Sequence, residues 1–331
     1  MRISGPPARA GQRKIEVLIV TLTLNPAIDR TIGVDRLAFE DRAYIKSSRE
    51  SAGGRGLNAS CVVHSFGGCT TAVLASGGES GKRLETLLGC CGHRVLIVPV
   101  KHETRTNLTI TDRHGLTVNL NEEGPELGKV EIARFERVVR ATLEKLKDPA
   151  ASWLMICGSI PPGVPHGFYG KLVAMARERK VRTLLHTGGE ALLHGVEASP
   201  TVVTPNQQEA ERLLGRNLLT RTHYLEAAAA IRSMGPESVV LSLASRGAVG
   251  AFPTGIVEAL PPRVDTLCPI GAGDALAAAY VWAMSRGSDP TDALRWGVAA
   301  GTASARLPGV SFASLAQTEE IYRKVEMRRV E

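Results

Sequence analysis

The stretch from residue 153 to residue 243 alternates short apolar runs with longer segments of helical pattern. Apolar runs of this length are typical of buried strands. Strands that are separated by helices of this length favour a mostly parallel sheet with helices on both faces. The predicted strands and helices occupy residues 153–157, 167–179, 181–186, 207–214, 225–234 and 238–243.

The same alternation extends toward the N-terminus. An apolar run at residues 17–24 stops at Asn25-Pro26, as a buried strand would. We therefore predict an α/β fold with a doubly wound, mostly parallel sheet. Further helices and strands are expected at residues 57–66, 71–75, 81–88, 130–146 and 275–284.

Two segments, residues 31–50 and 105–120, are more polar than the rest. In them, polar and apolar residues alternate, as in strands that are covered on one face only. The second segment is typical of a hairpin that turns at His114-Gly115. We expect the two segments to form one small β-sheet lid, inserted into a single domain of residues 14–331. Residues 1–13, rich in Gly, Pro, Ala and Arg, are expected to be a disordered basic tail.

The net charge of +7 over 331 residues raises the question of a nucleic-acid partner. However, the basic residues are scattered and aromatic residues make up only 4%, so no basic stripe with stacking rings is present. An anionic small substrate explains the charge, and so does a modest general basicity. No segment approaches the ~20 apolar residues of a membrane span, so we expect neither a nucleic acid nor a membrane as partner.

The cysteines indicate a cytoplasmic protein. None of the six forms a Cys-x-x-Cys pair, and most lie inside apolar runs, as reduced core residues do. They are Cys61, Cys69, Cys90, Cys91, Cys157 and Cys268.

The segment Pro269-Ile270-Gly271-Ala272-Gly273-Asp274 has the composition of an anion-binding helix start. Its two glycines leave the backbone free to expose N–H groups, and residues 275–284 are strong helix formers. Those N–H groups and the helix dipole would both favour a negative charge above the loop. Asp274 would take a proton from a hydroxyl beside this anion site, which suggests phosphoryl transfer. The alternative is that Asp274 is an ordinary first-turn residue.

Other loops that follow predicted strands carry polar residues or glycines, and ligands of a parallel sheet bind beyond such carboxyl ends. Each of these segments also has a purely structural explanation. Asp29 would be a turn residue, the glycines at 53–56 would allow a tight backbone turn, and Asn206 with Glu209 would cap a helix. The segments are Asp29, 53–58, 158–163, 204–209 and 242–247.

Taken together, these motifs resemble the PfkB, or ribokinase-like, family of carbohydrate kinases, and most of all its fructose-phosphate and tagatose-6-phosphate kinases. The resemblance covers residues 17–310, and five motifs in the right order make it specific. The motifs are TLTLNPAID at 21–29, GGRGLN at 53–58, GSIPPG at 158–163, PNQQE at 205–209 and GAGD at 271–274. The resemblance implies a lid that closes over the sugar and often pairs with a second subunit's lid, hence a homodimer.

The resemblance also implies roles for individual residues. Asp274 would be the general base, and the N–H groups of Ala272 and Gly273 would form the anion hole, with Gly271 as a further residue of this catalytic loop. Asp29, Gly53, Gly54, Asn58 and Ser159 would hold the sugar, while Arg42 and Arg105, with help from Lys46, would bind its phosphate. Residues 42, 44 and 46 would share one strand face; solvated surface charge is the alternative for both arginines. Asn206 and Glu209 would position Mg²⁺ through water, and Asn206, Ser242, Arg246 and Gly247 would contact the nucleotide.

The nucleotide side departs from the family pattern at five positions. The usual lysines are replaced by Thr204 and Gln208, and an aspartate is replaced by His186. The glycine of a Ser-Leu-Gly triplet is Ala244, and Pro269 stands where a Thr or Ser is common. We hypothesise that Arg246 partly replaces the missing lysines as a phosphate ligand.

The leading hypothesis is an enzyme that transfers the γ-phosphoryl of ATP, with Mg²⁺, to a ketohexose phosphate. Fructose 6-phosphate and fructose 1-phosphate are the first candidate substrates, and tagatose 6-phosphate is next. A catalytically weak or inactive sugar-phosphate-binding homologue is a second hypothesis, because of the residues at 186, 204 and 208. A nucleoside or free-sugar kinase of the same fold is a third.

Overall fold

The computed structural model describes residues 17–37, 41–89 and 91–330 of the chain. The expected tail, residues 1–13, therefore lies outside the described residues. Within the described residues, none of the helices is both long and apolar enough to cross a membrane.

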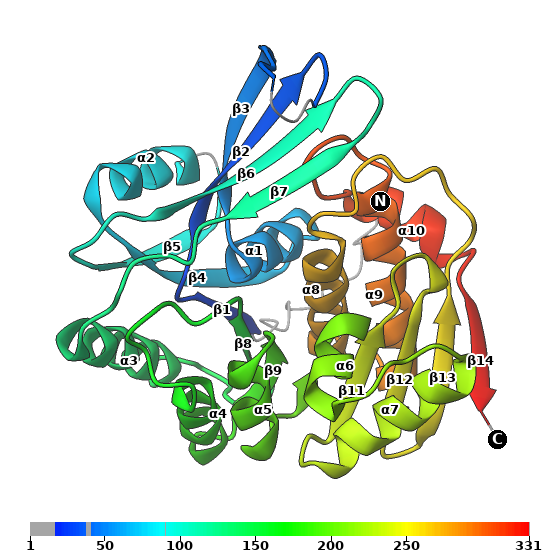
Figure 1. The fold of residues 1–331 in the computed structure, drawn as a ribbon. Coiled ribbons are helices and arrows are strands. Elements are labelled where there is room, and N and C mark those ends of the chain that lie inside the picture. Colours follow the sequence, from blue (N-terminus) through cyan, green and yellow to red (C-terminus); the bar gives the residue numbers. More distant parts are fainter. Residues whose placement is uncertain (1–16, 38–40, 90, 331) are drawn as a thin grey trace, which may run out of the picture.

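Ten strands in the described residues form one large sheet (Figure 1). The seven strands from β11 to β5 are mutually parallel, and β12, β13 and β14 continue the sheet in antiparallel fashion. The order across the sheet is β14 (Glu326–Val330), β13 (Gly255–Leu260), β12 (Ala248–Phe252), β11 (Ser238–Ser242), β10 (Val202–Val203), β9 (Arg182–His186), β8 (Trp153–Cys157), β1 (Leu18–Thr23), β4 (Cys69–Ser76) and β5 (Arg94–Pro99).

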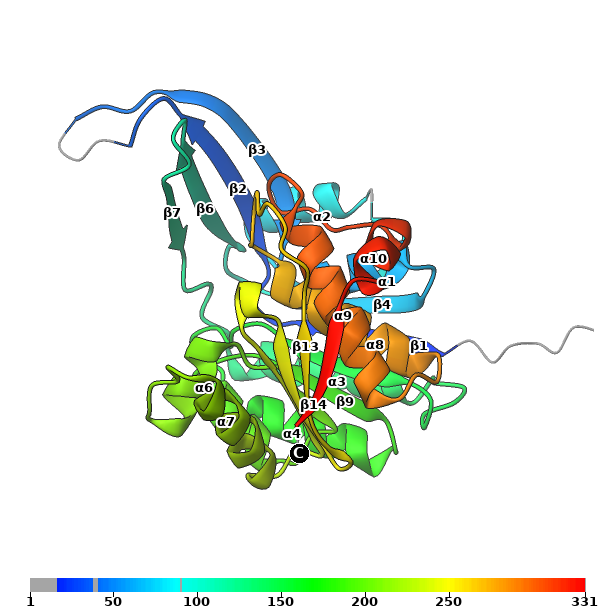
Figure 2. The same ribbon diagram turned by 90° about the vertical axis from the view of Figure 1, so that its right-hand side faces the viewer.

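Helices cover both faces of this sheet (Figures 1 and 2). One face carries α1 (Arg55–Ser65), α8 (Ala272–Ser285), α9 (Pro290–Ala305) and α10 (Leu315–Tyr322). The other face carries α3 (Lys129–Leu143), α4 (Phe168–Glu178), α5 (Glu190–Glu197), α6 (Gln207–Leu214) and α7 (Arg221–Ser233).

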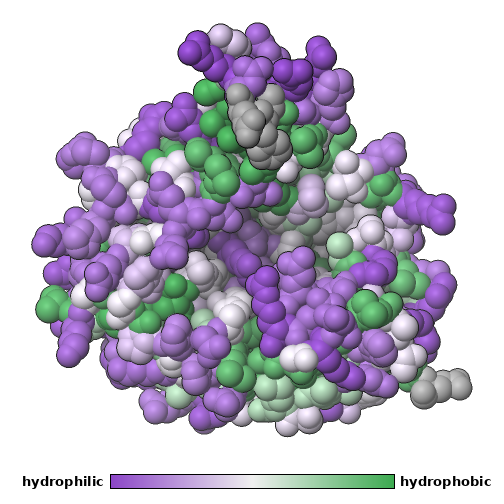
Figure 3. Space-filling view, in the orientation of Figure 1, coloured by the Kyte–Doolittle hydropathy of each residue, from purple (hydrophilic) through white to green (hydrophobic). Residues whose placement is uncertain are grey.

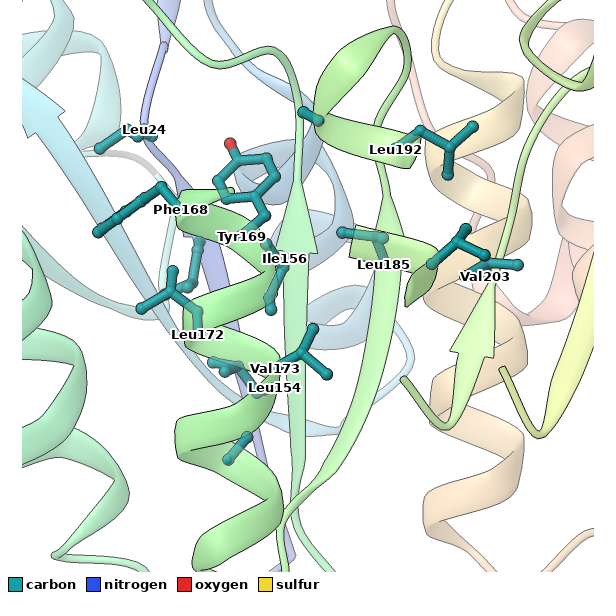
Figure 4. Packing of buried hydrophobic residues seen from close by; sticks show 14 of the residues in the cluster. Leu24, Leu154, Ile156, Phe168, Tyr169, Leu172, Val173, Leu185, Leu192 and Val203 are labelled. Carbon is teal, nitrogen blue, oxygen red and sulfur yellow. The ribbon is translucent and has the colours of Figure 1, made fainter. Parts of the chain in front are cut away.

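Alternation along the strands divides the core between the two faces. In β8, Leu154 and Ile156 belong to the cluster that includes α4, whereas Trp153 and Met155 belong to the cluster that includes α8. Successive side chains of a strand point to opposite faces, so an uninterrupted apolar run is what a strand covered on both faces requires. Figure 4 shows Leu154 and Ile156 beside α4.

A second, four-stranded sheet projects from the large one (Figure 2). Its order is β3 (Ile45–Gly53), β2 (Ala27–Val34), β6 (Arg105–Asp112) and β7 (Thr117–Asn121). The parallel pairing of β2 with β6 joins two segments that are far apart in the sequence. Helix α2 (Gly78–Leu88) packs beside this sheet. The predicted fold class is confirmed: a mostly parallel large sheet, helices on both faces and a small separate sheet.

Several local expectations differ from the structure. The antiparallel edge of the large sheet and the helices α5, α9 and α10 were not predicted. Strand β3 begins at Ile45, so Arg42 precedes the strand and the expected alternation of 42, 44 and 46 on one strand face is wrong. Of the cysteines expected in the core, Cys157 is buried, and Cys90 lies outside the described residues. The partly exposed ones are Cys61, Cys69, Cys91 and Cys268.

Candidate active site

A cavity of about 560 Å³ lies between the small sheet and the carboxyl ends of the parallel strands. The face shown in Figure 3 is hollowed in this region, with hydrophilic residues at its centre. A polar hollow of this size suits a small hydrophilic ligand. Ten of the predicted site residues line it: Asp29, Gly54, Asn58, Arg105, Ser159, Asn206, Ser242, Gly271, Gly273 and Asp274.

The anion-binding loop precedes α8 as expected. Gly271 adopts a left-handed φ of 83° at the N-cap, and a Cβ there would lie 3.0 Å from the Phe312 ring. A side chain would thus be strained in both backbone and packing, so glycine suits this turn. Ala272 begins the helix, and its first-turn N–H groups lie at the positive end of the α8 dipole.

Asp274 is held from two sides. Its Oδ2 accepts a hydrogen bond from Asn58 Nδ2 at 2.7 Å, and its Oδ1 lies 3.0 Å from His186 Nε2. The residue is 7% exposed, yet it lines the cavity. Each carboxylate oxygen has a second lone pair, so Asp274 retains the capacity to accept from a ligand hydroxyl.

Asp29, on β2 of the small sheet, also lines the cavity. Its Oδ1 accepts from Asn107 Nδ2 at 2.8 Å. A Cβ on Gly53 would come within 2.6 Å of the Asp29 carboxyl carbon and both of its oxygens. Only glycine at position 53 therefore leaves room for the Asp29 carboxyl group. Burial raises the pKa of Asp29 above its ordinary value of 3.8, and the Asn107 hydrogen bond and the Arg105 charge offset only part of this effect.

Three buried polar atoms at the cavity have no hydrogen-bond partner among the described residues: Asn25 Oδ1, Arg105 Nε and Asn107 Oδ1. Arg105 donates from Nη1 to the Glu122 carbonyl oxygen at 2.8 Å, and burial lowers its pKa. Ser159 lies next to them and accepts from Asn25 Nδ2 at 3.1 Å. Buried polar groups are normally paired, so this wall is suited to a ligand that has both hydrogen-bond donors and acceptors.

The predicted nucleotide residues divide into two groups. Asn206 and Ser242 line the cavity. Arg246 lies outside its lining, with its guanidinium 4.9 Å from the Tyr224 ring and hydrogen-bonded to Gln207. Gly247 follows Arg246, also outside the cavity lining, with a φ of 89°. Their contact with a nucleotide stays a prediction. Gln208 faces a separate hollow on α6.

Asn206 and Glu209 form the helix cap that was the structural alternative: Asn206 Oδ1 accepts from the Glu209 N–H, and Glu209 Oε2 accepts from the Asn206 N–H, both at 2.9 Å. Glu209 Oε1 also accepts from both Nη atoms of Arg55 at 3.0 Å. Burial lowers the pKa of Arg55, but the charges of Glu209 and Asp274 outweigh it and raise the pKa overall. Arg55 therefore stays a fixed cation in the cavity wall.

The described residues contain no cluster of three His, Cys, Asp or Glu side chains that is placed to hold a metal directly. Glu209 Oε1 accepts two hydrogen bonds and Oε2 accepts one, so the Oε2 lone pair that remains fits contact with a hydrated Mg²⁺ through water. Mg²⁺ commonly keeps several waters and takes most of its other ligands from substrate phosphates.

Arg42 and Lys46 are not brought to the cavity within this chain. Both are exposed, and neither lines the cavity. Their contact with a substrate phosphate stays a prediction.

Several cavity residues were not singled out from the sequence. Arg55 lies inside a recognised motif but was assigned no role. The polar residues of β6 and β7 occur at every second position, a spacing that places them on one strand face and could have identified them. They are Asn107, Thr109, Asn119 and Asn121.

Comparison with known proteins agrees with this arrangement. The profile of the "pfkB family carbohydrate kinase" family matches residues 22–317. The ATP-dependent 6-phosphofructokinase isozyme 2 of Mycobacterium tuberculosis is 31% identical, over 92% of this chain and 88% of the relative. The 1-phosphofructokinase of Vibrio cholerae is 26% identical, over 93% and 96%. Phosphofructokinase-2 of Escherichia coli in complex with fructose-6-phosphate superposes with a TM-score of 0.84 at 29% identity, over 93% and 99%.

We predict that Asp29→Asn stabilises the protein at neutral pH. The raised pKa means that the stability contributed by Asp29 is fully present below 3.8 and is lost as the pH rises through the folded-state pKa. Asn keeps the shape without the buried charge. Denaturant unfolding should therefore give a higher midpoint for the variant at pH 7, and the two midpoints should converge near pH 4. A lower midpoint for the variant at pH 7 would contradict the predicted stabilisation.

Proposed function

Because the chain belongs to the PfkB family of carbohydrate kinases and is a phosphofructokinase-like enzyme, we propose that it phosphorylates a ketohexose phosphate. In the proposed reaction, the substrate hydroxyl oxygen bonds to the γ-phosphorus of ATP. The bond from that phosphorus to the β–γ bridging oxygen breaks, and ADP leaves. The hydroxyl proton passes to Asp274.

The observation that carries this proposal is the position of Asp274 at the N-terminus of α8, in the wall of the cavity. Its carboxylate is beside a loop whose N–H groups suit a transferring phosphoryl. A base and an anion hole next to each other support phosphoryl transfer more than either would alone.

The sugar would bind on the side of Asp29 and Arg105. The unpartnered buried atoms on this wall support recognition of a hydroxylated ligand, and the guanidinium of Arg105 supports a phosphorylated one. Relatives are named both 6-phosphofructokinase and 1-phosphofructokinase. We therefore propose fructose 6-phosphate and fructose 1-phosphate as first substrates, and tagatose 6-phosphate as the next.

ATP would bind on the side of Asn206 and Ser242, and Mg²⁺ through water near Asn206 and Glu209. When bound, Mg²⁺ would offset the charge of the nucleotide phosphates. Arg55 provides a cation in the same wall, where the usual lysines are replaced by Thr204 and Gln208. We propose that Arg55 takes over part of their electrostatic role.

We propose a homodimer that forms through the small sheet. Asn119 and Asn121 of β7 line the cavity, so Leu120 between them faces the other side. There it pairs across the strands with Leu108 and is 53% exposed. Val118 and Ile110 extend this apolar face. An uncovered apolar face of a sheet favours a second copy as its partner.

A coupled ADP-release assay tests the proposed function. We expect ATP and Mg²⁺ to support turnover with fructose 6-phosphate or fructose 1-phosphate, and much less with free ketohexoses or nucleosides. The same panel should be measured by thermal shift. If sugar phosphates raise the unfolding temperature while none raises ADP release, the protein is a binding homologue and not a kinase. If only a nucleoside or free sugar is turned over, the phosphate preference is wrong.

Asp274→Asn should abolish turnover and keep sugar binding. The amide matches the carboxylate in shape but cannot take the hydroxyl proton, so we expect kcat to fall by about 10²- to 10⁴-fold. Calorimetry should give a sugar-phosphate Kd within about threefold of the wild type. Full activity of the variant would refute the assignment of Asp274 as the base.

Leu120→Glu should convert the proposed dimer to a monomer, because it places a charge on the apolar face of the small sheet. Leu219, which is 74% exposed and lies between α6 and α7, provides the matched control, and Leu219→Glu should leave the dimer intact. Sedimentation velocity measures both. A wild-type protein that is monomeric at all accessible concentrations would exclude the dimer.

A further inference from the structure

Two residues that depart from the family pattern, His186 and Thr204, contact each other, and His186 also contacts the proposed base, Asp274. His186, at the end of β9, lies 2.9 Å from the Thr204 hydroxyl and 3.1 Å from the Thr204 carbonyl oxygen through Nδ1. Its Nε2 lies 3.0 Å from Asp274 Oδ1. Thr204, His186 and Asp274 are 3%, 7% and 7% exposed, so water competes little for these contacts. The three side chains form one buried chain of hydrogen bonds.

The direction of each hydrogen bond follows from the groups involved. An ionised Asp274 only accepts, so His186 must donate from Nε2. A neutral imidazole then carries no proton on Nδ1, which must accept. The carbonyl oxygen of Thr204 cannot donate, whereas its hydroxyl can. In a neutral His186, the Thr204 hydroxyl donates to Nδ1 at 2.9 Å rather than to the Leu185 carbonyl oxygen at 3.5 Å, and this selects the tautomer that bonds to Asp274.

We propose that His186 is a positioning residue for Asp274, held in its Nε2–H tautomer by the Thr204 hydroxyl. The proposal rests on the proposed function of Asp274 as the base. With Asn58 bonded to Oδ2 and His186 to Oδ1, the carboxylate plane is fixed from both ends. The remaining lone pairs then face the cavity in one orientation, which is what rapid proton transfer from a bound hydroxyl needs.

The surroundings favour this role over a contact with substrate. His186 lines the cavity, but both of its ring nitrogens are engaged, Nδ1 by Thr204 and Nε2 by Asp274. A Cβ on Gly273 would lie 3.8 Å from His186 Cε1. Other groups around Asp274 that can carry charge are Arg55, paired with Glu209, Asp29 across the cavity and the thiol of Cys157. Burial raises the pKa of Cys157, so it stays a neutral thiol.

The test is a double-mutant cycle with Thr204→Val and His186→Gln. Valine removes the hydroxyl at almost constant volume, and the Gln side-chain amide can still donate to Asp274 but has no tautomer to select. We expect Thr204→Val to lower kcat about 3- to 10-fold in the wild-type background and less than twofold in the His186→Gln background. Thr204→Ser, which keeps the hydroxyl, should restore kcat. The KM for the sugar phosphate should change less than threefold in all of them.

His186→Ala, which removes the donor, should lower kcat about 10- to 100-fold, and His186→Gln should recover part of this loss. Without the donor, the acidic limb of the kcat/KM profile should shift to higher pH, because the ionised form of Asp274 loses a stabilising hydrogen bond. A merely structural effect of His186 would leave that limb in place. Thr183→Val, on the same strand and remote from Asp274, controls for loss of a buried hydroxyl and should keep kcat.

The outcomes separate this inference from the proposed function. If the wild type turns over no sugar phosphate, the proposed function fails. If the wild type is active but Thr204→Val costs the same in both backgrounds, the tautomer role is overturned. If His186→Ala keeps kcat and the acidic limb, the positioning role is overturned, and circular dichroism melting of each variant shows whether a loss of activity reflects unfolding instead.

Discussion

The position of α8, which carries the proposed base Asp274, depends on how closely α9 approaches it. Gly297 and Gly301, one turn apart on α9, face α8, and a Cβ on either would lie 2.9 Å from a carbonyl oxygen of that helix. Helix α8 in turn consists largely of small, buried residues. Short side chains allow the two backbones to pack in contact, and this leaves the helix little freedom to tilt. The anion loop and Asp274 at the N-terminus of α8 are therefore fixed in part by packing against α9, including a close approach at Ala272 itself.

Two of the five departures on the nucleotide side, His186 and Thr204, contact each other. His186 contacts both Thr204 and Asp274, the proposed base, and Arg55 pairs with Glu209 in the same cavity wall. A further departure, Ala244, adopts a φ of 52°, where the family's glycine would be unstrained, at a cost of about 1 kcal/mol. The two departures His186 and Thr204 thus provide hydrogen-bond partners for each other's buried polar atoms.

The sequence predicts the parallel half of the fold well, because buried strands and amphipathic helices leave strong periodic signals. Strand Trp153–Cys157 and helix Gln207–Leu214 agree residue for residue. Helix α9 was missed since its face toward α8 is made of glycine and alanine, which carry little hydrophobic pattern. In the site, residues within motifs were identified from the sequence, but the contact between Thr204 and His186 depends on sheet register, and sequence spacing does not reveal it.

The parallel pairing of β2 with β6 has a kinetic consequence. Asp29 and Asn107 are partners in this register, yet 78 positions separate them along the chain, with α1, β4, α2 and β5 in between. Closing so long a loop costs entropy that only the completed contacts repay. The wall of the cavity that carries Asp29 is thus expected to form after the intervening elements have docked on the large sheet. A chain arrested early in folding would then have α8 but not the wall proposed to bind the sugar.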